Sequence, residues 1–361
     1  MGIRLEVFVL VGGLGLFLGC GDAGGEGGAG GDASGQGATG TGGAAPTSTT
    51  STTSTGGGAG GGTVEPDPSP GCAMASPYPG GTTTEDMLVH DDLERTFRVH
   101  LPPAYEDGTP APLVLMLHGG GGSGRQLEED SSKMSEVADR EGFIAVYPDG
   151  TGTLRTWNGG GCCGSAVTNE IDDVGFVAAL LDQLEATICV DRRRIYASGM
   201  SNGGILSHRL ACELPSRFAA VAPVAGAEMA PTCTPSEPVA LMHIHGTADG
   251  HVPPEGGFGC GPANVSFPPL ADTLERRRLI NGCEESPSPT FTAGDGTCSA
   301  YDGCAADVVL CLIQGGGHSW PGGEPNADVI ECPEDGPQST TFSASEEVWR
   351  FFAEHPKPGP G

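Results

Sequence analysis

One serine in the sequence stands in a pattern that could make it a nucleophile. Ser201 lies in the G-x-S-x-G segment 199–203, after a β-like run at 194–198 and before a helical run at 205–214. A sharp strand-to-helix turn exposes a serine hydroxyl, and small neighbours permit that turn. Because the chain has 62 glycines in 361 residues, the pattern could arise by chance as a glycine-rich loop, so the flanking elements carry the prediction.

A serine hydroxyl needs a base within reach and a group that orients the base. Asp249 follows the β-like run at 239–244, and His318 follows the run at 308–313. The order Ser, Asp, His, with each residue just past a strand, is that of α/β-hydrolases. We therefore predict that Ser201 attacks, that His318 is the base and that Asp249 orients it.

Five other residues compete for these roles. His243, His245 and His251 are rival bases, but the first two lie on or at the end of a strand, where packing is the commoner role. Asp172 and Asp173 are rival acids that precede the serine at an expected helix start, where carboxylates commonly cap. We assign these two aspartates structural roles.

The oxyanion of a tetrahedral intermediate needs backbone N–H donors. Asn202 is expected to supply one, at the start of the helix after the serine. Gly119 or Gly120 should supply the second, from the glycine run that follows the β-like run at 113–117. Trp157 and Trp320 could form an aromatic wall for the substrate, or they could be buried in the core.

The same glycine run also fits a dinucleotide-binding pattern. Gly119, Gly121 and Gly124 satisfy G-x-G-x-x-G, with Asp149 as a ribose ligand. That interpretation leaves the serine, aspartate and histidine unexplained. A P-loop is excluded because Arg125 stands where lysine is required. We therefore predict no cofactor and no metal.

Short apolar runs alternate with longer helical ones, which predicts an α/β fold. We expect a mostly parallel central sheet with helices on both faces, stabilised by disulfides. A helix is expected around 172–187, and a last helix at 341–352. The strands are expected at residues 95–101, 113–117, 143–147, 194–198, 218–224, 239–244 and 308–313.

The beginning of the chain differs in composition from the rest. Residues 1–20 read as an export signal of lipoprotein type, with a short apolar run and Gly19 before Cys20, the residue to be lipidated. Plain secretion is the alternative. Residues 21–84 are rich in Gly, Ser, Thr and Pro and are expected to be a disordered linker. The folded α/β body is expected at 85–355, with a disordered tail at 356–361.

Cysteine usage points to an oxidising compartment. Of thirteen cysteines, twelve remain when Cys20 is set aside, and no tight C-x-x-C pairs suit zinc. Disulfides are therefore expected, with connectivity open. Cys72 could fix the linker to the body. The adjacent Cys162 and Cys163 could each bond elsewhere or to one another.

The charge of the chain limits its partners. There are 46 acidic and 17 basic residues, a formal net charge of −29. This field repels nucleic acids and anionic lipids, so we expect no nucleic-acid partner and membrane contact only through a lipid at Cys20. The protein is expected at the outer membrane or cell surface, or secreted, as a monomer. Neutral esters remain possible substrates.

Several motifs together resemble a known group of enzymes. They look like the esterases known as polyhydroxybutyrate depolymerases and the feruloyl and acetylxylan esterases of carbohydrate esterase family one. The resemblance covers residues 95–322 and rests on the motifs at 118–120, 157–158, 163–164, 172–176, 199–204, 222–226, 245–249 and 317–322. It implies an α/β-hydrolase with Ser201, Asp249 and His318 as its triad.

The chain also departs from that group. Pro254 follows Val252 and Pro253 where many relatives have Tyr, and the segment 325–336 looks like an extra loop. The function expected is a serine ester hydrolase acting on feruloyl or acetyl esters of plant polysaccharide or on polyhydroxybutyrate-like polyesters. The alternative is a tethered binding protein for such polymers that has lost turnover.

Overall fold

A computed structural model describes residues 64–324 and 332–359 of the chain. The expected signal at 1–20 with Cys20, and the linker up to residue 63, lie outside the described residues. Among the residues that are described, no helix is both long and apolar enough to cross a bilayer.

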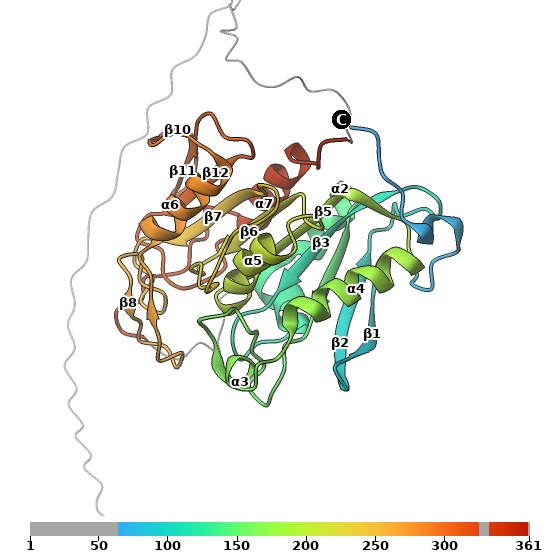
Figure 1. Cartoon of the computed structure of the whole chain (residues 1–361), viewed down its shortest axis with the longest axis horizontal. Coiled ribbons are helices and arrows are strands. Elements are labelled where there is room, and N and C mark those ends of the chain that lie inside the picture. Colours follow the sequence, from blue (N-terminus) through green and yellow to red (C-terminus); the bar gives the residue numbers. More distant parts are fainter. Residues whose placement is uncertain (1–63, 325–331, 360–361) are drawn as a thin grey trace, which may run out of the picture. The chain divides into compact units, whose positions relative to one another are not determined.

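One large sheet forms the centre of the protein (Figure 1). Its ten strands lie in the order β1-β2-β4-β3-β5-β6-β7-β12-β11-β10, and the six from β4 to β12 are mutually parallel. The predicted mostly parallel sheet is confirmed. The strands span Thr82–His90 (β1), Leu93–Leu101 (β2), Ala111–Leu117 (β3), Ile144–Pro148 (β4), Val190–Met200 (β5), Ala220–Val224 (β6), Ala240–Gly246 (β7), Pro287–Ala293 (β10), Gly296–Tyr301 (β11) and Val308–Ile313 (β12).

Helices cover both faces of this sheet, as predicted. Helices α4, α5 and α6 pack on one face, and α2 and α7 on the other. A separate two-stranded sheet consists of β8 and β9. The remaining elements are η1 (Pro70–Ala73), α1 (Gly124–Gln126), η2 (Leu127–Ser132), α2 (Met134–Glu141), α3 (Gly164–Thr168), α4 (Asp173–Thr187), α5 (Asn202–Glu213), β8 (Gly257–Phe258), β9 (Ser266–Phe267), α6 (Leu270–Asn281) and α7 (Ala344–Glu354).

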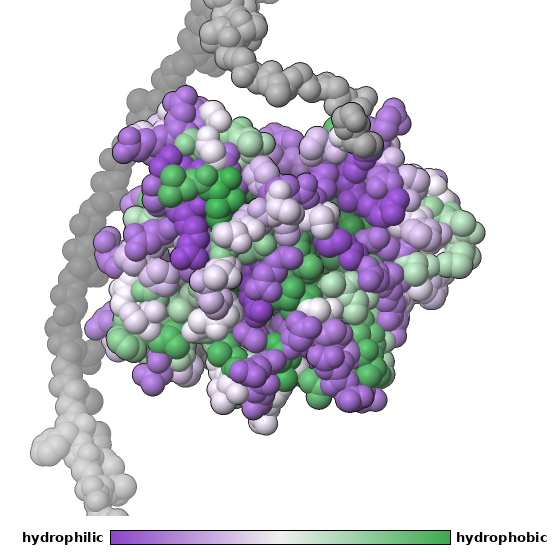
Figure 2. All heavy atoms as spheres, viewed as in Figure 1, coloured by the Kyte–Doolittle hydropathy of each residue, from purple (hydrophilic) through white to green (hydrophobic). Residues whose placement is uncertain are grey.

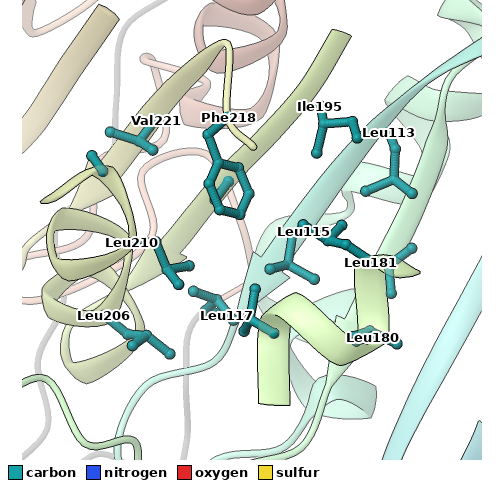
Figure 3. Packing of buried hydrophobic residues seen from close by; sticks show 14 of the residues in the cluster. Leu113, Leu115, Leu117, Leu180, Leu181, Ile195, Leu206, Leu210, Phe218 and Val221 are labelled. Atoms are coloured by element: carbon teal, nitrogen blue, oxygen red, sulfur yellow. The ribbon is translucent and has the colours of Figure 1, made fainter. Parts of the chain in front are cut away.

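The core follows from the alternation of side chains along the central strands. In β3 the odd-numbered leucines, such as Leu115, pack under α4 and α5, whereas Val114 and Met116 pack on the opposite face. Both faces of the strand are therefore apolar, as expected for a strand between two helix layers. Figure 3 shows side chains that pack between the sheet and helices α4 and α5, among them Leu115, Leu117, Leu180, Leu181, Leu206 and Leu210.

The expected linker boundary at residue 84 is wrong. Strand β1 begins at Thr82, the Tyr78 side chain is buried, and Cys72 is joined to Cys189. The chain therefore folds onto the body well before residue 84. The expected tail at 356–361 also begins too early, because the Lys357 ammonium donates to Pro215 O.

All twelve cysteines of the described residues are paired, which confirms a disulfide-stabilised fold. Cys162 and Cys163 are bonded to one another rather than elsewhere. The other five pairs are Cys72–Cys189, Cys212–Cys233, Cys260–Cys332, Cys283–Cys304 and Cys298–Cys311.

Candidate active site

Ser201 lies on the turn between β5 and α5. Its backbone has φ 54° and ψ −118°, a conformation that residues other than glycine rarely adopt. The turn is possible only because its neighbours are small: a Cβ at Gly203 would lie 2.1 Å from Leu117 O, and one at Gly199 would lie 2.6 Å from the same atom. The strand-turn-helix arrangement expected around Ser201 is therefore present.

The glycine run after β3 lies against this turn. A Cβ at Gly119 would lie 3.5 Å from the Ser201 Cβ, and one at Gly120 would lie 3.8 Å from the Asn202 Cβ. His118 fixes the start of the run, because its Nδ1 donates to Gly119 O at 2.7 Å and its Nε2 accepts from Gly150 N at 2.9 Å. Burial lowers the pKa of His118 to about 4, so this imidazole is neutral.

The Asn202 side chain holds a neighbouring segment in place. Its Oδ1 accepts from Trp157 N at 2.7 Å, and its Nδ2 donates to Trp157 O at 2.9 Å. The indole of Trp157 donates in turn to His118 O at 2.9 Å. The Asn202 side chain thus ties the start of α5 to the segment beside the glycine run.

Asp249 and His318 are in direct contact. The His318 Nδ1 lies 2.9 Å from Asp249 Oδ2, and both side chains are almost fully buried. Asp249 Oδ1 accepts from the backbone N–H groups of His251 and Val252, at 2.9 and 2.8 Å. This carboxylate therefore holds the imidazole through one oxygen and its own loop through the other.

The charges of this pair influence one another. Burial opposes the ionised form of Asp249, but His318, His245 and the Val252 N–H outweigh it, so the pKa of Asp249 is lowered. Burial also opposes protonation of His318, yet the carboxylates of Asp249 and Asp335 outweigh it, so the pKa of His318 is raised. A raised pKa makes an imidazole a stronger base, but the imidazole must be neutral before it can accept a proton.

Ser201 and His318 line the same cavity, which has a volume of about 1290 Å³. No hydrogen bond joins the Ser201 hydroxyl to the His318 imidazole among the contacts of the described residues. Such bonds often tighten only when substrate is bound. The structure therefore brings the aspartate and histidine into contact and places the serine on the wall that the histidine also lines.

Asp335 was missed in the sequence and lies beside the aspartate–histidine pair. Its Oδ1 accepts from Gly250 N and from His318 N, each at 2.9 Å. One carboxylate thus connects the loop that carries Asp249 with the loop that carries His318. Asp335 lies in the segment 325–336, three residues after Cys332, which is joined to Cys260.

Two substitutions separate the charge of Asp335 from its hydrogen bonds. Asp335→Asn keeps an acceptor oxygen but removes the negative charge that raises the pKa of His318. The base predicted from the sequence, His318, would have to be neutral, so the acid limb of the kcat/KM profile should move to lower pH in this variant. Asp335→Ala also removes the two acceptors and should lower kcat by about tenfold. Profiles between pH 5 and 9 check both, and equal behaviour of the two variants would contradict this role.

The rival residues have structural positions. Asp172 caps α4 by accepting from Gly175 N, and buried Asp173 pairs with Arg95 at 2.6 Å. Neither lines the cavity that Ser201 lines. His251 does line it, with its ring stacked on His318 at a centroid distance of 4.8 Å. His243 and His245 are buried in β7, as expected.

The expected aromatic wall is wrong. Trp157 is fully buried and Trp320 is 2% exposed, and neither lines the cavity. Both indole N–H groups are used inside the protein, that of Trp320 by Ser345 Oγ at 3.0 Å. The described cavity lining contains aliphatic and other apolar side chains instead, among them Leu93, Leu154, Ile171, Ile205, Val252 and Phe267.

The residues on which the dinucleotide interpretation depends have structural roles. Asp149 accepts from Gly124 N at 2.9 Å and from Thr96 Oγ1 at 2.7 Å, so it braces the glycine run. A Cβ at Gly124 would lie 2.4 Å from Tyr147 O, which explains that glycine by packing. Asp249, His251 and Asp335 come within metal-ligand distance of one another, but Asp249 is already the partner of His318.

Comparison with known proteins adds to this geometry. Residues 96–244 match the family described as Esterase PHB depolymerase. NocK of Nocardia uniformis subsp. tsuyamanensis, a proposed esterase, is 32% identical over 271 residues, which span 68% of this chain and 76% of that protein. Feruloyl esterase B of Piromyces equi is 31% identical over 64% of this chain and 44% of its own length.

A solved structure shares the fold. The acetyl xylan esterase from Aspergillus awamori superposes with a TM-score of 0.53 at 14% identity, covering 75% of this chain and 99% of that one. The superposition with that enzyme supports an α/β-hydrolase fold for this chain. The sequence similarity to the relatives above supports its family membership. The chain therefore belongs to the Esterase PHB depolymerase family, and the protein is an esterase with an α/β-hydrolase fold.

Proposed function

We propose that the protein hydrolyses carboxylic esters through a triad of Ser201, His318 and Asp249. The observation that carries this proposal is the 2.9 Å contact between His318 Nδ1 and Asp249 Oδ2 at the cavity that Ser201 also lines. A buried carboxylate fixes the tautomer of the histidine, so that Nε2 is left as the base. The strained backbone of Ser201 presents its hydroxyl at the end of β5.

The reaction proceeds in two acyl transfers. His318 Nε2 takes the hydroxyl proton as Ser201 Oγ attacks the ester carbonyl, and the imidazolium is stabilised by Asp249. The backbone N–H of Asn202 and that of Gly119 or Gly120 donate to the oxyanion. The alkoxide then leaves with the proton from His318, forming an acyl-enzyme. Water attacks this intermediate with His318 as base, and Ser201 regains its proton as the acid is released.

The substrate is a neutral ester of one of two classes. It is either a feruloyl or acetyl ester on plant polysaccharide, or a polyhydroxybutyrate-like polyester. Relatives named feruloyl esterase support the first class, and the family description supports the second. The largely apolar lining of the cavity suits an uncharged acyl group. Hydrophilic residues dominate the face shown in Figure 2, with smaller apolar patches between them. Because the chain has a formal net charge of −29, it repels polyanionic substrates.

A side-by-side assay tests this function. The purified chain would be incubated with methyl ferulate, acetylated xylan and a short-chain polyhydroxybutyrate film, with p-nitrophenyl butyrate as a general ester. Turnover of at least one of the three above a heat-killed control is expected, and it identifies the substrate class. Release of no acid and no chromophore from any of them would contradict the proposal.

We infer that the protein is exported and anchored through a lipid on Cys20. Six disulfides in the described residues support an oxidising compartment. In a bacterial host, labelled palmitate should enter the full chain but not the Cys20→Ser variant. Equal labelling of the two chains, or none in either, would contradict lipidation and favour plain secretion.

A further inference from the structure

Three buried histidines form a hydrogen-bonded chain behind the candidate triad. His208 on α5 has its Nε2 3.2 Å from Nδ1 of His243 on β7. His243 has its Nε2 3.0 Å from Nδ1 of His245, two residues further along the same strand. All three side chains are almost completely buried. The proposed reaction uses none of them, and the sequence alone suggested only packing for the two on the strand.

The last link of this chain fixes its direction. His245 Nε2 lies 2.9 Å from Val252 O, and a carbonyl oxygen can only accept, so this nitrogen carries the proton. In a neutral imidazole the other nitrogen is then an acceptor, so His245 Nδ1 accepts from His243 Nε2. By the same step His243 Nδ1 accepts from His208 Nε2. The Val252 carbonyl and the two contacts between the rings therefore together favour the Nε2–H tautomer in all three rings.

The rings are held neutral by their surroundings. Burial lowers the pKa of each of the three histidines, and the neighbouring imidazoles of the chain lower those of His208 and His243 further. At the outer end His208 Nδ1 lies 4.0 Å from Glu228 Oε2, and Glu228 is itself neutralised by Arg277 at 2.7 Å and by Arg276 at 3.0 Å. Glu228 is therefore paired with cations, and at the inner end the carboxylate of Asp249 raises the pKa of His243 and His245 by less than burial lowers it.

The inner end of the chain reaches the candidate acid. His245 Nε2 is 3.3 Å from Asp249 Oδ2, the oxygen that also contacts His318 Nδ1. Its acceptor Val252 holds Asp249 Oδ1 through its own N–H at 2.8 Å. In the Nε2–H tautomer, the partly positive N–H hydrogen of His245 therefore faces the Asp249 carboxylate. The opposite tautomer would face it with a lone pair and would favour protonation of Asp249.

We propose that His245 is a positioning residue that keeps Asp249 ionised and directed at His318. The Val252 carbonyl and the hydrogen bond from His243 together hold it in its Nε2–H form. This inference rests on the proposed triad. His245 touches neither substrate nor the reacting atoms in this role, because it acts only through Asp249 and the loop after it.

A packing role alone does not account for the arrangement. Three polar rings in a core lose hydration, and apolar side chains of similar volume would fill the same space without that cost. Each inward ring nitrogen has a partner at hydrogen-bond distance, and the bonds point in one direction toward the acid. Such order is expected where a specific protonation state is required.

The tautomers can be measured directly in the wild-type protein. The chain would be labelled with ¹⁵N-histidine, and long-range ¹H–¹⁵N correlation spectra would be recorded at pH 7, with ring signals assigned from single variants. We expect all three rings to be neutral with the proton on Nε2. A proton on Nδ1 of His245 or His243, or a doubly protonated ring, would overturn the proposal.

A matched pair of variants tests the effect on the reaction. The amide of His243→Gln can still donate to His245 Nδ1, whereas His243→Leu has similar bulk and no donor. We expect His243→Leu to lower kcat by about tenfold with KM unchanged, and His243→Gln to recover most of that loss. The ring ¹⁵N signals of His245 should show a mixture of the two neutral tautomers in His243→Leu, and only the Nε2–H tautomer in His243→Gln. Equal kcat in the two variants would overturn the proposal.

The failure of this inference and that of the proposed function can be distinguished. If Ser201→Ala retains turnover, the triad itself is wrong, whatever the histidine tautomers are. If Ser201→Ala is inactive but both His243 variants match the wild type, only the role of the histidine chain is wrong. A variant that does not fold leaves the wild-type tautomers as the deciding measurement.

Discussion

Ser201→Ala is expected to lower kcat for p-nitrophenyl butyrate by roughly 10⁴- to 10⁶-fold with little change in fold, because the attacking oxygen is lost. The side chain is half-buried at the cavity, so its removal leaves the surrounding core intact. Turnover under saturating substrate would be compared with the wild type, and the thermal midpoint would be measured alongside.

A serine far from the cavity provides the control for this variant. Ser288 lies on β10 at the edge of the sheet, with its hydroxyl 3.3 Å from Asp302 Oδ2. Ser288→Ala should retain wild-type turnover. If Ser201→Ala kept more than about 1% of the wild-type kcat, the residual rate would exceed what a site without its nucleophile supplies, and Ser201 would not be the nucleophile.

Asp249→Asn is expected to lower kcat by roughly 10⁴-fold, because an amide neither selects the correct tautomer of His318 nor stabilises its cation. Loss of the negative charge should also lower the pKa of His318, since Asp249 is the main group that raises it. The acid limb of the residual kcat/KM profile should therefore move to lower pH. Stopped-flow or prolonged steady-state assays between pH 5 and 9 measure both effects.

A second aspartate–histidine pair serves as the matched control. Asp307 Oδ2 contacts His355 Nε2 at 2.9 Å, the same distance as in the candidate site, but neither residue lines the cavity. Asp307→Asn should therefore leave kcat unchanged. Near wild-type turnover in Asp249→Asn would mean that Asp249 is not the group that orients His318.

Much of the fold could be predicted because the central strands carry a strong local signal. The runs expected at 113–117 and 308–313 correspond to β3 and β12, both continuously apolar and bounded by turns. The helix expected at 172–187 begins one residue later, because Asp172 caps it. The edge strands β1 and β10 were not predicted. In β10 the signal is weak because the strand contains Pro287 and Pro289 and is largely exposed.

The site was predictable where function requires a residue type next to a strand. Asp249 and His318 could be paired from the sequence because each follows a predicted strand, in the order typical of α/β-hydrolases. The structure places those strands, β7 and β12, side by side. Asp335 could not be found in this way, because no pattern marks it and its two contacts depend on a disulfide-fixed loop. The histidines of β7 carried a weak signal, namely two polar rings in an otherwise apolar strand.

The tryptophans show where sequence reasoning fails. A tryptophan close to a catalytic motif fits a substrate wall and a core position equally well, and only the partner of its indole N–H decides. In this protein the Trp157 indole donates to the carbonyl of His118, directly before the glycine run. Trp157 therefore supports the proposed oxyanion donors from within the core, with no surface of its own in the cavity.

The most direct test of the account is covalent trapping of the activated serine. The wild-type chain would be treated with a fluorophosphonate, which reacts with activated serine hydroxyls, and its intact mass and peptides would be measured. The account predicts one adduct per chain, on the peptide that contains Ser201, with parallel loss of esterase activity and no adduct in Ser201→Ala. An adduct on another residue, or inhibition without modification of Ser201, would contradict it.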